Sequence, residues 1–397
     1  MYPKLVALDT DWTLFWGWLK VNEWGKGPGA YVPAEDNIEK RNYWEIQDRT
    51  NHNRACGMYA DVPKIIQDIL KNGAKLAIVS RNTSKGMCDR ALWHWTIQDQ
   101  HGKDKRVIEL VNFNEVYDAD KTTHFRKIKG WTNFDYSDMI LYDDEAINNT
   151  VEMMLGVTFQ VSRDQKGLTW DNYQEGLDIW RRTKAIHSLW HGTALNSYPK
   201  RKLIGFSGMD MGTIQQLEAG GRRTDRKEAA RWGFAMYVAD DPRVAIWFNQ
   251  WIKTYFPGVA TTVCAIYARD GDIWDRMNKI WVPDSRNDLK QNRASDFALG
   301  WSEEDRNRQV AQWGVKKPYV LFSRHPNMGG TFPVAGRFNE LVIYPQVQEN
   351  LILTVRISDN ELRSATNVYY QGKIREWNIT IPQETRNDFA RFRENIG

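Results

Sequence analysis

The sequence predicts two domains of different fold class. Over residues 1–182, short apolar segments alternate with helix signals, which is typical of an α/β domain with a parallel, Rossmann-like sheet. This alternation stops around Leu177–Lys184. Residues 185–397 carry short aromatic strands and long charged loops, which indicate an α+β domain with a mainly antiparallel, split sheet. A chain of 397 residues is long enough for two hydrophobic cores.

The elements of the first domain follow from local patterns. Lys4–Leu8 is an apolar run, expected as a buried strand, that ends abruptly in the polar sequence Asp9–Thr13. A helix is expected to begin near Asp61–Pro63 and to stop at Asn72-Gly73. Gly17–Gly57 is rich in glycine and polar residues and is expected as an insertion outside the core. Helix is also expected up to about Leu155, and three further strands at Lys75–Val79, Met139–Tyr142 and Val157–Val161.

The composition is that of a globular, intracellular protein. Hydrophobic residues make up 42% and charged residues 26% of the chain, and the net charge of +4 indicates an anionic partner only weakly. The three cysteines are far apart, which argues against a disulfide framework and suits a reducing compartment. No signal peptide or membrane-spanning run is visible in the sequence, so a cytoplasmic or nuclear location is expected.

Polar residues at the predicted strand ends suit phosphate chemistry. Asp9 and Asp11 lie two residues apart, so they point the same way from an extended backbone and can hold a divalent cation together. Asp9 is the candidate nucleophile, which would form an aspartyl-phosphate, and Asp11 is the candidate acid for the leaving oxygen. Carboxyl ends of parallel strands line the ligand crevice of open α/β sheets.

Two further strand ends and one loop complete this predicted site. Ser80, with Arg81 beside it, can donate to phosphoryl oxygens. Lys121 is expected in a polar loop, where its ammonium would offset their charge. Asp143 and Asp144 would form an oxygen-rich Mg²⁺ site with Asp9 and the backbone carbonyl of Asp11.

These residues resemble the haloacid dehalogenase superfamily, because Asp9–Thr13, Ser80, Lys121 and Asp143-Asp144 match its four motifs in order. The resemblance covers about residues 1–180. It is most specific for the magnesium-dependent phosphatase branch, through Asp61–Pro63, Val79–Arg81, Thr123–Phe125 and Tyr142–Glu145. The resemblance implies a Mg²⁺-dependent phosphatase that has a small cap or none, and therefore an open site.

The second half is expected to contain short antiparallel strands, at Ala260–Tyr267, Tyr319–Phe322, Leu341–Tyr344 and Leu351–Ile357. Arg222-Arg223 and the stretch Asp284–Arg308 are highly charged. They are expected as solvated, mobile loops.

Three short segments stand out in this half: Leu189–Thr193, Gly233–Asp240 and Phe338–Tyr344. Taken singly, each has a structural explanation, since a histidine beside a glycine is more often structural and aromatic residues are by default core residues. Glu340 differs, because a carboxylate that opens an apolar strand requires a partner or a function.

Together these segments resemble the ADP-ribosyltransferases with a His-Tyr-Glu triad, such as poly(ADP-ribose) polymerases and diphtheria toxin. Tyr237 and Phe248 lie eleven residues apart, like the family's two nicotinamide-stacking aromatics. The resemblance covers about residues 185–357 and implies that these two rings enclose the nicotinamide of NAD⁺. Phe248 stands where the family usually has a second tyrosine, so the stacking is kept but its hydroxyl is lost.

The remaining roles also come from this resemblance. His191 would bind the adenosine-side ribose and the backbone of Gly192 the carboxamide, with Thr193 in the same NAD⁺-binding segment. Glu340 would hold the 2′-hydroxyl of the nicotinamide ribose. A carboxylate there suits the chemistry, because loss of nicotinamide leaves an oxocarbenium-like cation.

The expected function is therefore bifunctional: a Mg²⁺-dependent phosphatase joined to an NAD⁺-dependent ADP-ribosyltransferase, acting in consecutive reactions. The acceptor would be a nucleic-acid end, given the basic loops and 19 tryptophans, or a protein side chain. Two alternatives remain open. One is an NAD⁺ glycohydrolase beside the phosphatase, and the other is a silent module that binds NAD⁺ or ADP-ribose for signalling.

Overall fold

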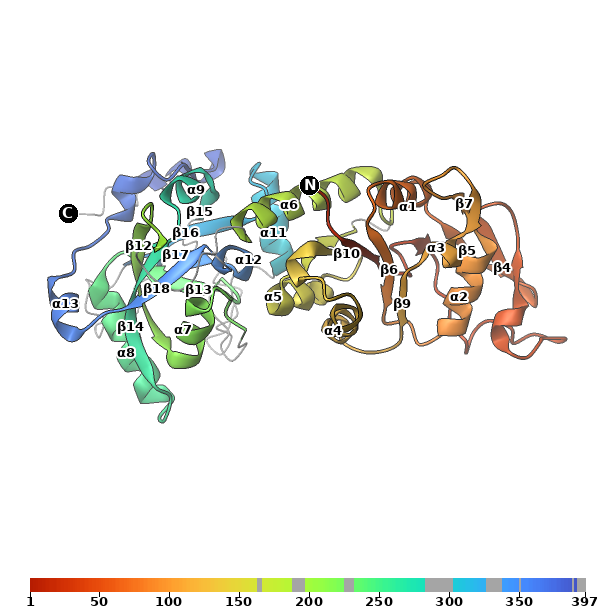
Figure 1. Cartoon of the computed structure of the whole chain (residues 1–397), viewed down its shortest axis with the longest axis horizontal. Coiled ribbons are helices and arrows are strands. Elements are labelled where there is room, and N and C mark those ends of the chain that lie inside the picture. Colours follow the sequence, from red (N-terminus) through yellow and green to blue (C-terminus); the bar gives the residue numbers. More distant parts are fainter. Residues whose placement is uncertain are drawn as a thin grey trace. The chain divides into compact units, whose positions relative to one another are not determined.

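The computed structural model describes residues 1–397 except 163–165, 188–196, 225–231, 283–302, 326–337, 350, 388 and 391–397. The chain divides into two compact units, Met1–Lys184 and Ala185–Gly397 (Figure 1). Each unit has its own main sheet and its own hydrophobic core.

The first unit is built on a five-stranded sheet in the order β11-β10-β1-β6-β9, with every neighbouring pair parallel. The parallel α/β architecture predicted from the sequence is confirmed. Edge strand β9 was not predicted, because its sequence is half polar and its first two residues are only partly buried. The strands are β1 (Leu5–Leu8), β6 (Lys75–Ser80), β9 (Phe113–Val116), β10 (Met139–Asp143) and β11 (Thr158–Val161).

Helices cover both faces of this sheet, as alternate residues of β1 demonstrate. Val6 and Leu8 join a core cluster with residues of α1 (Val62–Lys71), α2 (Lys85–His94) and α6 (Trp170–His187). Leu5 and Ala7 face the opposite way, toward α4 (Lys121–Thr132) and α5 (Thr150–Leu155). A small α3 (Val107–Leu110) and the hairpin of β7 (Thr96–Gln98) and β8 (Asp104–Arg106) complete the unit.

The segment of residues 17–57 corrects a prediction. It was expected as an insertion outside the core, but part of it folds with β2 into a small antiparallel sheet in the order β2-β5-β4-β3. Leu19, Trp24 and Ile46 are buried and belong to the same cluster as Val6 of β1. The apolar residues of this segment are widely spaced, so no strand or helix periodicity in the sequence predicted that they would be buried. The strands are β2 (Phe15–Trp16), β3 (Ile38–Lys40), β4 (Glu45–Asp48) and β5 (Asn51–Met58).

The second unit contains one eight-stranded mixed sheet in the order β18-β14-β12-β13-β17-β16-β15-β19. Most pairs are antiparallel, as predicted, but β15 pairs in parallel with both β16 and β19. A single residue pair, Phe206 with Ala239, joins β12 to β13 in the described register. The strands are β12 (Lys202–Asp210), β13 (Met236–Ala239), β14 (Thr261–Ala268), β15 (Asn278–Val282), β16 (Tyr319–His325), β17 (Phe338–Ile343), β18 (Ile352–Arg356) and β19 (Ile379–Thr380).

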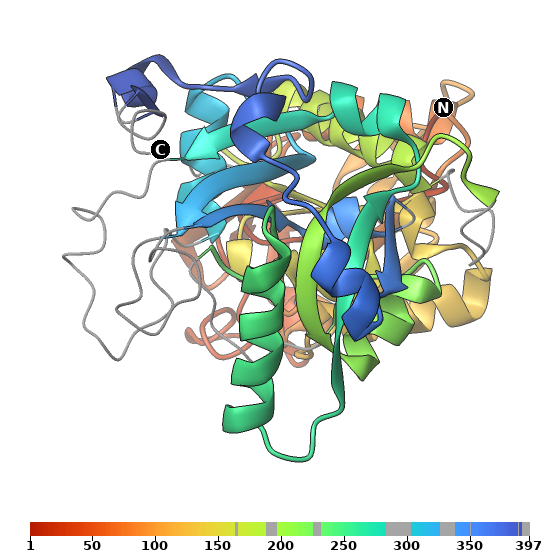
Figure 2. The same cartoon turned by 90° about the vertical axis from the view of Figure 1, so that its left-hand side faces the viewer.

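Helix α8 packs along β12 and β14 of this sheet (Figure 2). Two charged segments differ from the predicted mobile loops, since Arg222 is buried beside Glu349 and Arg306 is buried in α11. Residues 283–302 of the second segment lie outside the described residues. The helices are α7 (Met211–Glu218), α8 (Pro242–Tyr255), α9 (Gly271–Arg276), α11 (Glu303–Gln312), α12 (Pro345–Gln348) and α13 (Asp359–Ser364).

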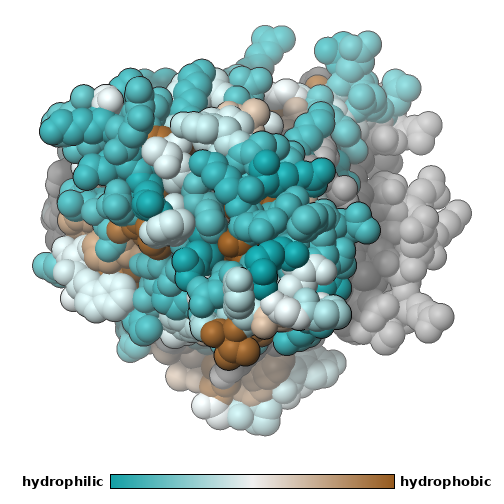
Figure 3. Space-filling view, turned by 90° about the vertical axis from the view of Figure 1, so that its right-hand side faces the viewer, coloured by the Kyte–Doolittle hydropathy of each residue, from teal (hydrophilic) through white to brown (hydrophobic). Residues whose placement is uncertain are grey.

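The surface drawn in Figure 3 is mostly hydrophilic, with small hydrophobic patches scattered over it. Scattered apolar groups of this kind are normal on protein surfaces and need no partner. Among the described residues, no helix combines the length and the apolar character needed to span a lipid bilayer.

Candidate active site

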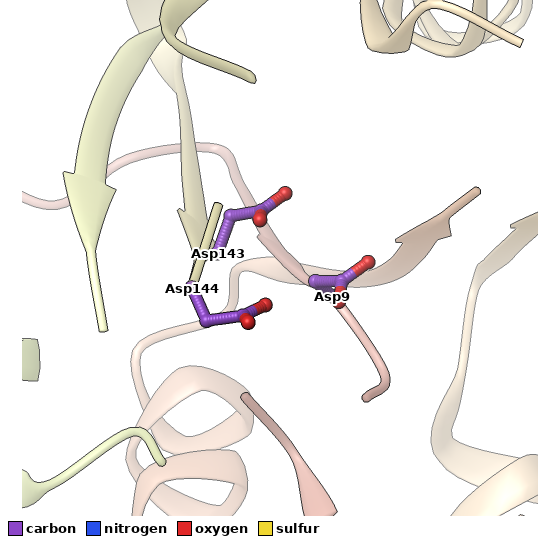
Figure 4. Close-up of side chains that lie close together, drawn as sticks. All are labelled: Asp9, Asp143 and Asp144. Atoms are coloured by element: carbon purple, nitrogen blue, oxygen red, sulfur yellow. The ribbon is translucent and has the colours of Figure 1, made fainter. Parts of the chain in front are cut away.

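Three carboxylates converge where two neighbouring parallel strands end. Asp9 directly follows β1, Asp143 is the last residue of β10, and Asp144 comes next. The order of the strands reverses between β1 and β10, and such a switch point opens a crevice at the carboxyl edge of the sheet. Carboxylate oxygens of the three residues lie within 4.8 Å of one another, with the side chains turned to the same side (Figure 4).

Lys121 supplies a buried positive charge to this cluster. Its ammonium donates to Asp9 Oδ1 at 2.6 Å and also to Asp143 Oδ2. Lys121 was expected in a polar loop, but it is the first residue of α4 and is only 1% exposed. Burial by itself would lower the pKa of Lys121. The two carboxylates outweigh burial and raise that pKa above its ordinary value.

The carboxylates themselves are crowded and poorly hydrated. Burial raises the pKa of Asp9 well above its ordinary value, against the opposing effect of Lys121. Burial, followed by the charge of Asp143, raises the pKa of Asp144 to about 6. Hard oxygen donors of this kind and number fit Mg²⁺ or another hard divalent cation, whose charge would offset the crowding.

Asp11 has different surroundings from the carboxylate cluster. Its Oδ2 accepts from the side-chain nitrogen of Asn82 at 2.8 Å and from the hydroxyl of Thr10 at 3.3 Å. Its Oδ1 accepts from the backbone nitrogen of Leu19 at 3.5 Å. Burial raises the pKa of Asp11, which favours the protonated acid. The expected role of its backbone carbonyl as a metal ligand stays a prediction.

The chain makes a tight turn directly after Asp11. Trp12 has a φ of 57°, which is rare for a bulky residue and is held by its backbone nitrogen donating to the oxygen of Phe15 at 2.8 Å. The backbone nitrogen of Leu14 donates to the oxygen of Thr10 at 3.0 Å. These bonds reverse the chain immediately after the acid and lead it into the small antiparallel sheet.

The two donors predicted after β6 point in different directions. Ser80 is buried at the end of β6, and its hydroxyl lies 2.6 Å from that of Thr10. Arg81 is exposed and donates to Asp118 at 3.2 Å. The structure therefore brings Ser80 close to the Asp9–Asp11 turn and leaves Arg81 at the surface.

Two asparagines of the site were not predicted. Asn82 donates to Asp11, and Asn148 donates to Asp143 Oδ2 at 2.9 Å. Both are buried and lie within five residues of the end of β6 or of β10. That proximity is the signal that could have found them, since polar residues just after parallel strands line the crevice.

In the second unit, Tyr237 and Glu340 share a partner. They lie on the neighbouring strands β13 and β17. The indole nitrogen of Trp232 donates to Glu340 Oε1 at 3.1 Å, and its backbone nitrogen donates to the Tyr237 hydroxyl at 2.8 Å. That hydroxyl in turn donates to the backbone oxygen of Gly233 at 2.9 Å. Trp232 was not predicted, and no local pattern marks it.

The other residues predicted to bind NAD⁺ do not share the Trp232 contacts of Tyr237 and Glu340 in the described interactions. Phe248, in α8, lies edge-to-face with Phe338 at 5.9 Å between ring centroids. Tyr237 packs against a different cluster, which includes Trp232 and Tyr344. The predicted residues His191, Gly192 and Thr193 lie outside the described residues.

Comparison with known proteins agrees with the geometry of the first unit. Residues 1–183 match the family described as Acid Phosphatase. The HAD-like hydrolase superfamily protein P8B7.31 of Schizosaccharomyces pombe is 27% identical over 158 residues, which are 40% of this chain and 84% of that protein. Magnesium-dependent phosphatase 1 of Homo sapiens is 23% identical over 185 residues, 46% of this chain and 89% of that protein.

Among solved structures, a match is found with the N-terminal part of protein BF1531 from Bacteroides fragilis, which contains a phosphatase domain complexed with Mg. Its TM-score is 0.29 at 16% identity, and the match covers 45% of this chain and 40% of that one. On the sequence matches, residues 1–183 are an acid phosphatase family region whose relatives include haloacid dehalogenase-like and magnesium-dependent phosphatases.

Proposed function

We propose that residues 1–183 act as a Mg²⁺-dependent phosphatase that forms an aspartyl-phosphate on Asp9. The observation that carries this proposal is the convergence of the carboxylates of Asp9, Asp143 and Asp144 beside the buried ammonium of Lys121. The family match and the names of the two relatives support it. Asp9, Asp143 and Asp144 would hold the ion, which supplies positive charge to the phosphoryl oxygens when bound.

The proposed reaction has two steps, phosphorylation of Asp9 and hydrolysis of the aspartyl-phosphate. An Asp9 oxygen attacks phosphorus, the bond to the leaving oxygen breaks, and that oxygen keeps the electron pair and takes the proton of Asp11. Water then attacks the aspartyl-phosphate and gives its proton to the Asp11 carboxylate. Phosphate leaves, and both aspartates return to their starting states.

Asp9→Asn tests this proposal. An amide is a poor nucleophile, so hydrolysis of an aryl phosphate in Mg²⁺ is expected to fall by at least about 10³-fold. Asp178→Asn, at an exposed aspartate of α6, is the matched control and is expected to keep full activity. Activity in Asp9→Asn equal to that of the control would contradict the proposed nucleophile.

We infer a second function, NAD⁺-dependent ADP-ribosyl transfer, for residues 185–397. The observation that favours it is the link of Tyr237 and Glu340 through Trp232, together with the burial of Glu340, which is 3% exposed. In this reaction the glycosidic bond to nicotinamide breaks, and nicotinamide keeps the electron pair. Glu340 would stabilise the ribosyl cation. An acceptor oxygen on a nucleic-acid end or a protein then bonds to the ribose and loses its proton.

Labelled NAD⁺, incubated with the full chain and separate pools of protein, RNA and DNA, tests this second function. Transfer of label is expected, and Glu340→Gln is expected to remove it. Glu361→Gln is the matched control, because glutamine can keep the capping contact of that exposed residue with Ser358. Release of free ADP-ribose alone would indicate the glycohydrolase, and binding of NAD⁺ without turnover would indicate the silent module.

A further inference from the structure

We propose that Asn82 is a positioning residue for Asp11, holding the proposed acid in the orientation that delivers its proton to the leaving group. The proposal rests on the phosphatase function proposed above. It is carried by a closed ring of hydrogen bonds that begins and ends at Asn82 and passes through Asp11.

The side chain of Asn82 is fixed by all of its polar atoms. It is 8% exposed and lies two residues beyond the end of β6. Its amide nitrogen donates to Asp11 Oδ2 at 2.8 Å and to the backbone oxygen of Leu19 at 3.0 Å. Its amide oxygen accepts from the backbone nitrogen of Ser84 at 2.7 Å. An amide held at three points on two separate loops has a single orientation.

Donation in the ring runs from Asn82 to Asp11 along both of its branches. The backbone nitrogen of Asn82 donates to Ser80 Oγ at 3.2 Å, so the Ser80 hydroxyl is free to donate to Thr10 across 2.6 Å. The Thr10 hydroxyl donates to Asp11 Oδ2 at 3.3 Å, where the side chain of Asn82 closes the ring. Both lone pairs of Oδ2 are then used, which leaves Oδ1 to carry the proton of the neutral acid.

Distances indicate which contact holds Asp11. The bonds from Leu19 and Thr10, at 3.5 and 3.3 Å, are longer than usual for strong hydrogen bonds, whereas the bond from Asn82 is of ordinary length at 2.8 Å. Asn82 also fixes the chain around Leu19, and Ser84 accepts from the backbone nitrogen of Val21 at 2.9 Å. Removing the Asn82 side chain therefore removes the direct bond to Asp11 and also the bond that fixes Leu19, whose backbone nitrogen contacts Asp11.

If Asn82 positions the acid, the loss of rate in an Asn82 variant should depend on the leaving group. An alkoxide leaves poorly and needs a proton as the bond to phosphorus breaks, whereas 4-nitrophenolate leaves without one. In Asn82→Ala, kcat/KM for an alkyl phosphate, which reports the steps up to loss of the leaving group, is expected to fall about 100-fold, within the range for general acid catalysis. For 4-nitrophenyl phosphate we expect kcat/KM to fall by less than about 3-fold.

The ratio of the two kcat/KM values is the deciding readout, because it excludes the later hydrolysis of the aspartyl-phosphate and does not depend on how much of the variant is folded. Asn82→Ser serves as a second variant with the same expected ratio, and Asn72→Ala, at the exposed end of α1, is the control with the ratio of the unchanged protein. Equal losses for both esters, or no loss, would overturn the positioning role. Failure of the unchanged protein to hydrolyse either ester would instead overturn the proposed phosphatase.

Discussion

Lys121 places a buried ammonium between the carboxylates of Asp9 and Asp143. A buried ion pair contributes little net stability when intact, but removing one partner leaves the other charge without compensation. Within the part of the chain that the structure describes, Lys121 is the cation that these two carboxylates contact directly. When no divalent ion is bound, Lys121 therefore compensates the negative charge at the ends of β1 and β10.

We predict that Lys121→Met lowers the free energy of unfolding by about 3 kcal/mol in EDTA, because two buried carboxylates lose their cation. Mg²⁺ is expected to stabilise this variant more than the unchanged protein, since the ion replaces the missing charge. Urea unfolding with EDTA and with Mg²⁺ measures both effects. Equal stabilisation of the two proteins by Mg²⁺ would argue against ion binding at Asp9, Asp143 and Asp144.

At the scale of elements, Gly176 determines how closely α6 approaches β10. A Cβ at this position would lie 2.6 Å from the ring and hydroxyl of Tyr142, which is fully buried and bonded to the backbone oxygen of Tyr173 at 2.7 Å. The Tyr142 ring has little room to move. The contact between helix and sheet therefore requires glycine here, in spite of its low helix propensity.

Gly176→Ala is expected to destabilise the protein by about 1–2 kcal/mol, because overpacking outweighs the gain in helix propensity. Gly130→Ala is the matched control in α4, where a new Cβ meets nothing within 4 Å. That variant is expected to gain about 0.5–1 kcal/mol. Urea unfolding of the pair tests the close approach, and a stabilising effect in both variants would refute it.

A second link between elements is an ion-pair cluster at Asp138. Its carboxylate contacts Lys4, just before β1, at 2.8 Å and Lys184 in α6 at 2.5 Å. Burial acts to raise the pKa of Asp138. The hydrogen bonds and charges of the two lysines outweigh it and lower this pKa below its ordinary value. The Asp138 carboxylate therefore links the start of β1 to α6, and this link depends on its ionisation.

Asp138→Asn is expected to lower the free energy of unfolding by about 1 kcal/mol at pH 7. A depressed folded-state pKa means that the unfolded chain binds the proton more readily, so the stabilisation is complete above the ordinary aspartate pKa. It is lost as the pH falls through the lowered value. The difference between the two proteins should therefore shrink as the pH falls below the ordinary aspartate pKa. Urea unfolding across this range measures it, and a constant difference would exclude the ionic origin.

Elements with their own local signals were predicted well. β1, β6 and β10 were found within one or two residues, because each is an apolar run followed by a polar end. The small sheet of residues 17–57 was not predicted, since its strands depend on packing against the core. The helix that begins at Lys121 was also misjudged, although Asp120 caps it by accepting from the backbone nitrogen of Thr122.

At the scale of the whole molecule, the two units have separate cores, so the two proposed sites should fail separately. Asp9→Asn is expected to remove phosphate hydrolysis and to leave NAD⁺ consumption intact, and Glu340→Gln is expected to do the reverse. Both activities are measured on each full-length variant. A variant that loses both activities, while remaining folded by its unfolding transition, would contradict two independent sites.

The sequence by itself determined the strands β1, β6 and β10 of the first unit and the carboxylates that follow β1 and end β10. Those features follow from apolar periodicity and from the polar residue that ends each run, which are local properties of the chain. Local patterns of this kind also predicted β14, β16, β17 and β18 of the second unit's eight-stranded sheet, but not the parallel pairing of β15.

Only the tertiary structure decided which of these residues touch. Asn82 meets Asp11 across 71 positions of sequence and Trp232 meets Glu340 across 108, and no periodicity encodes either contact. Such contacts arise when strands and helices pack and bring their connecting loops together. The burial that results then determines the protonation preference of Asp11 and the charge environment of Asp9, because both depend on how much water the packed elements exclude.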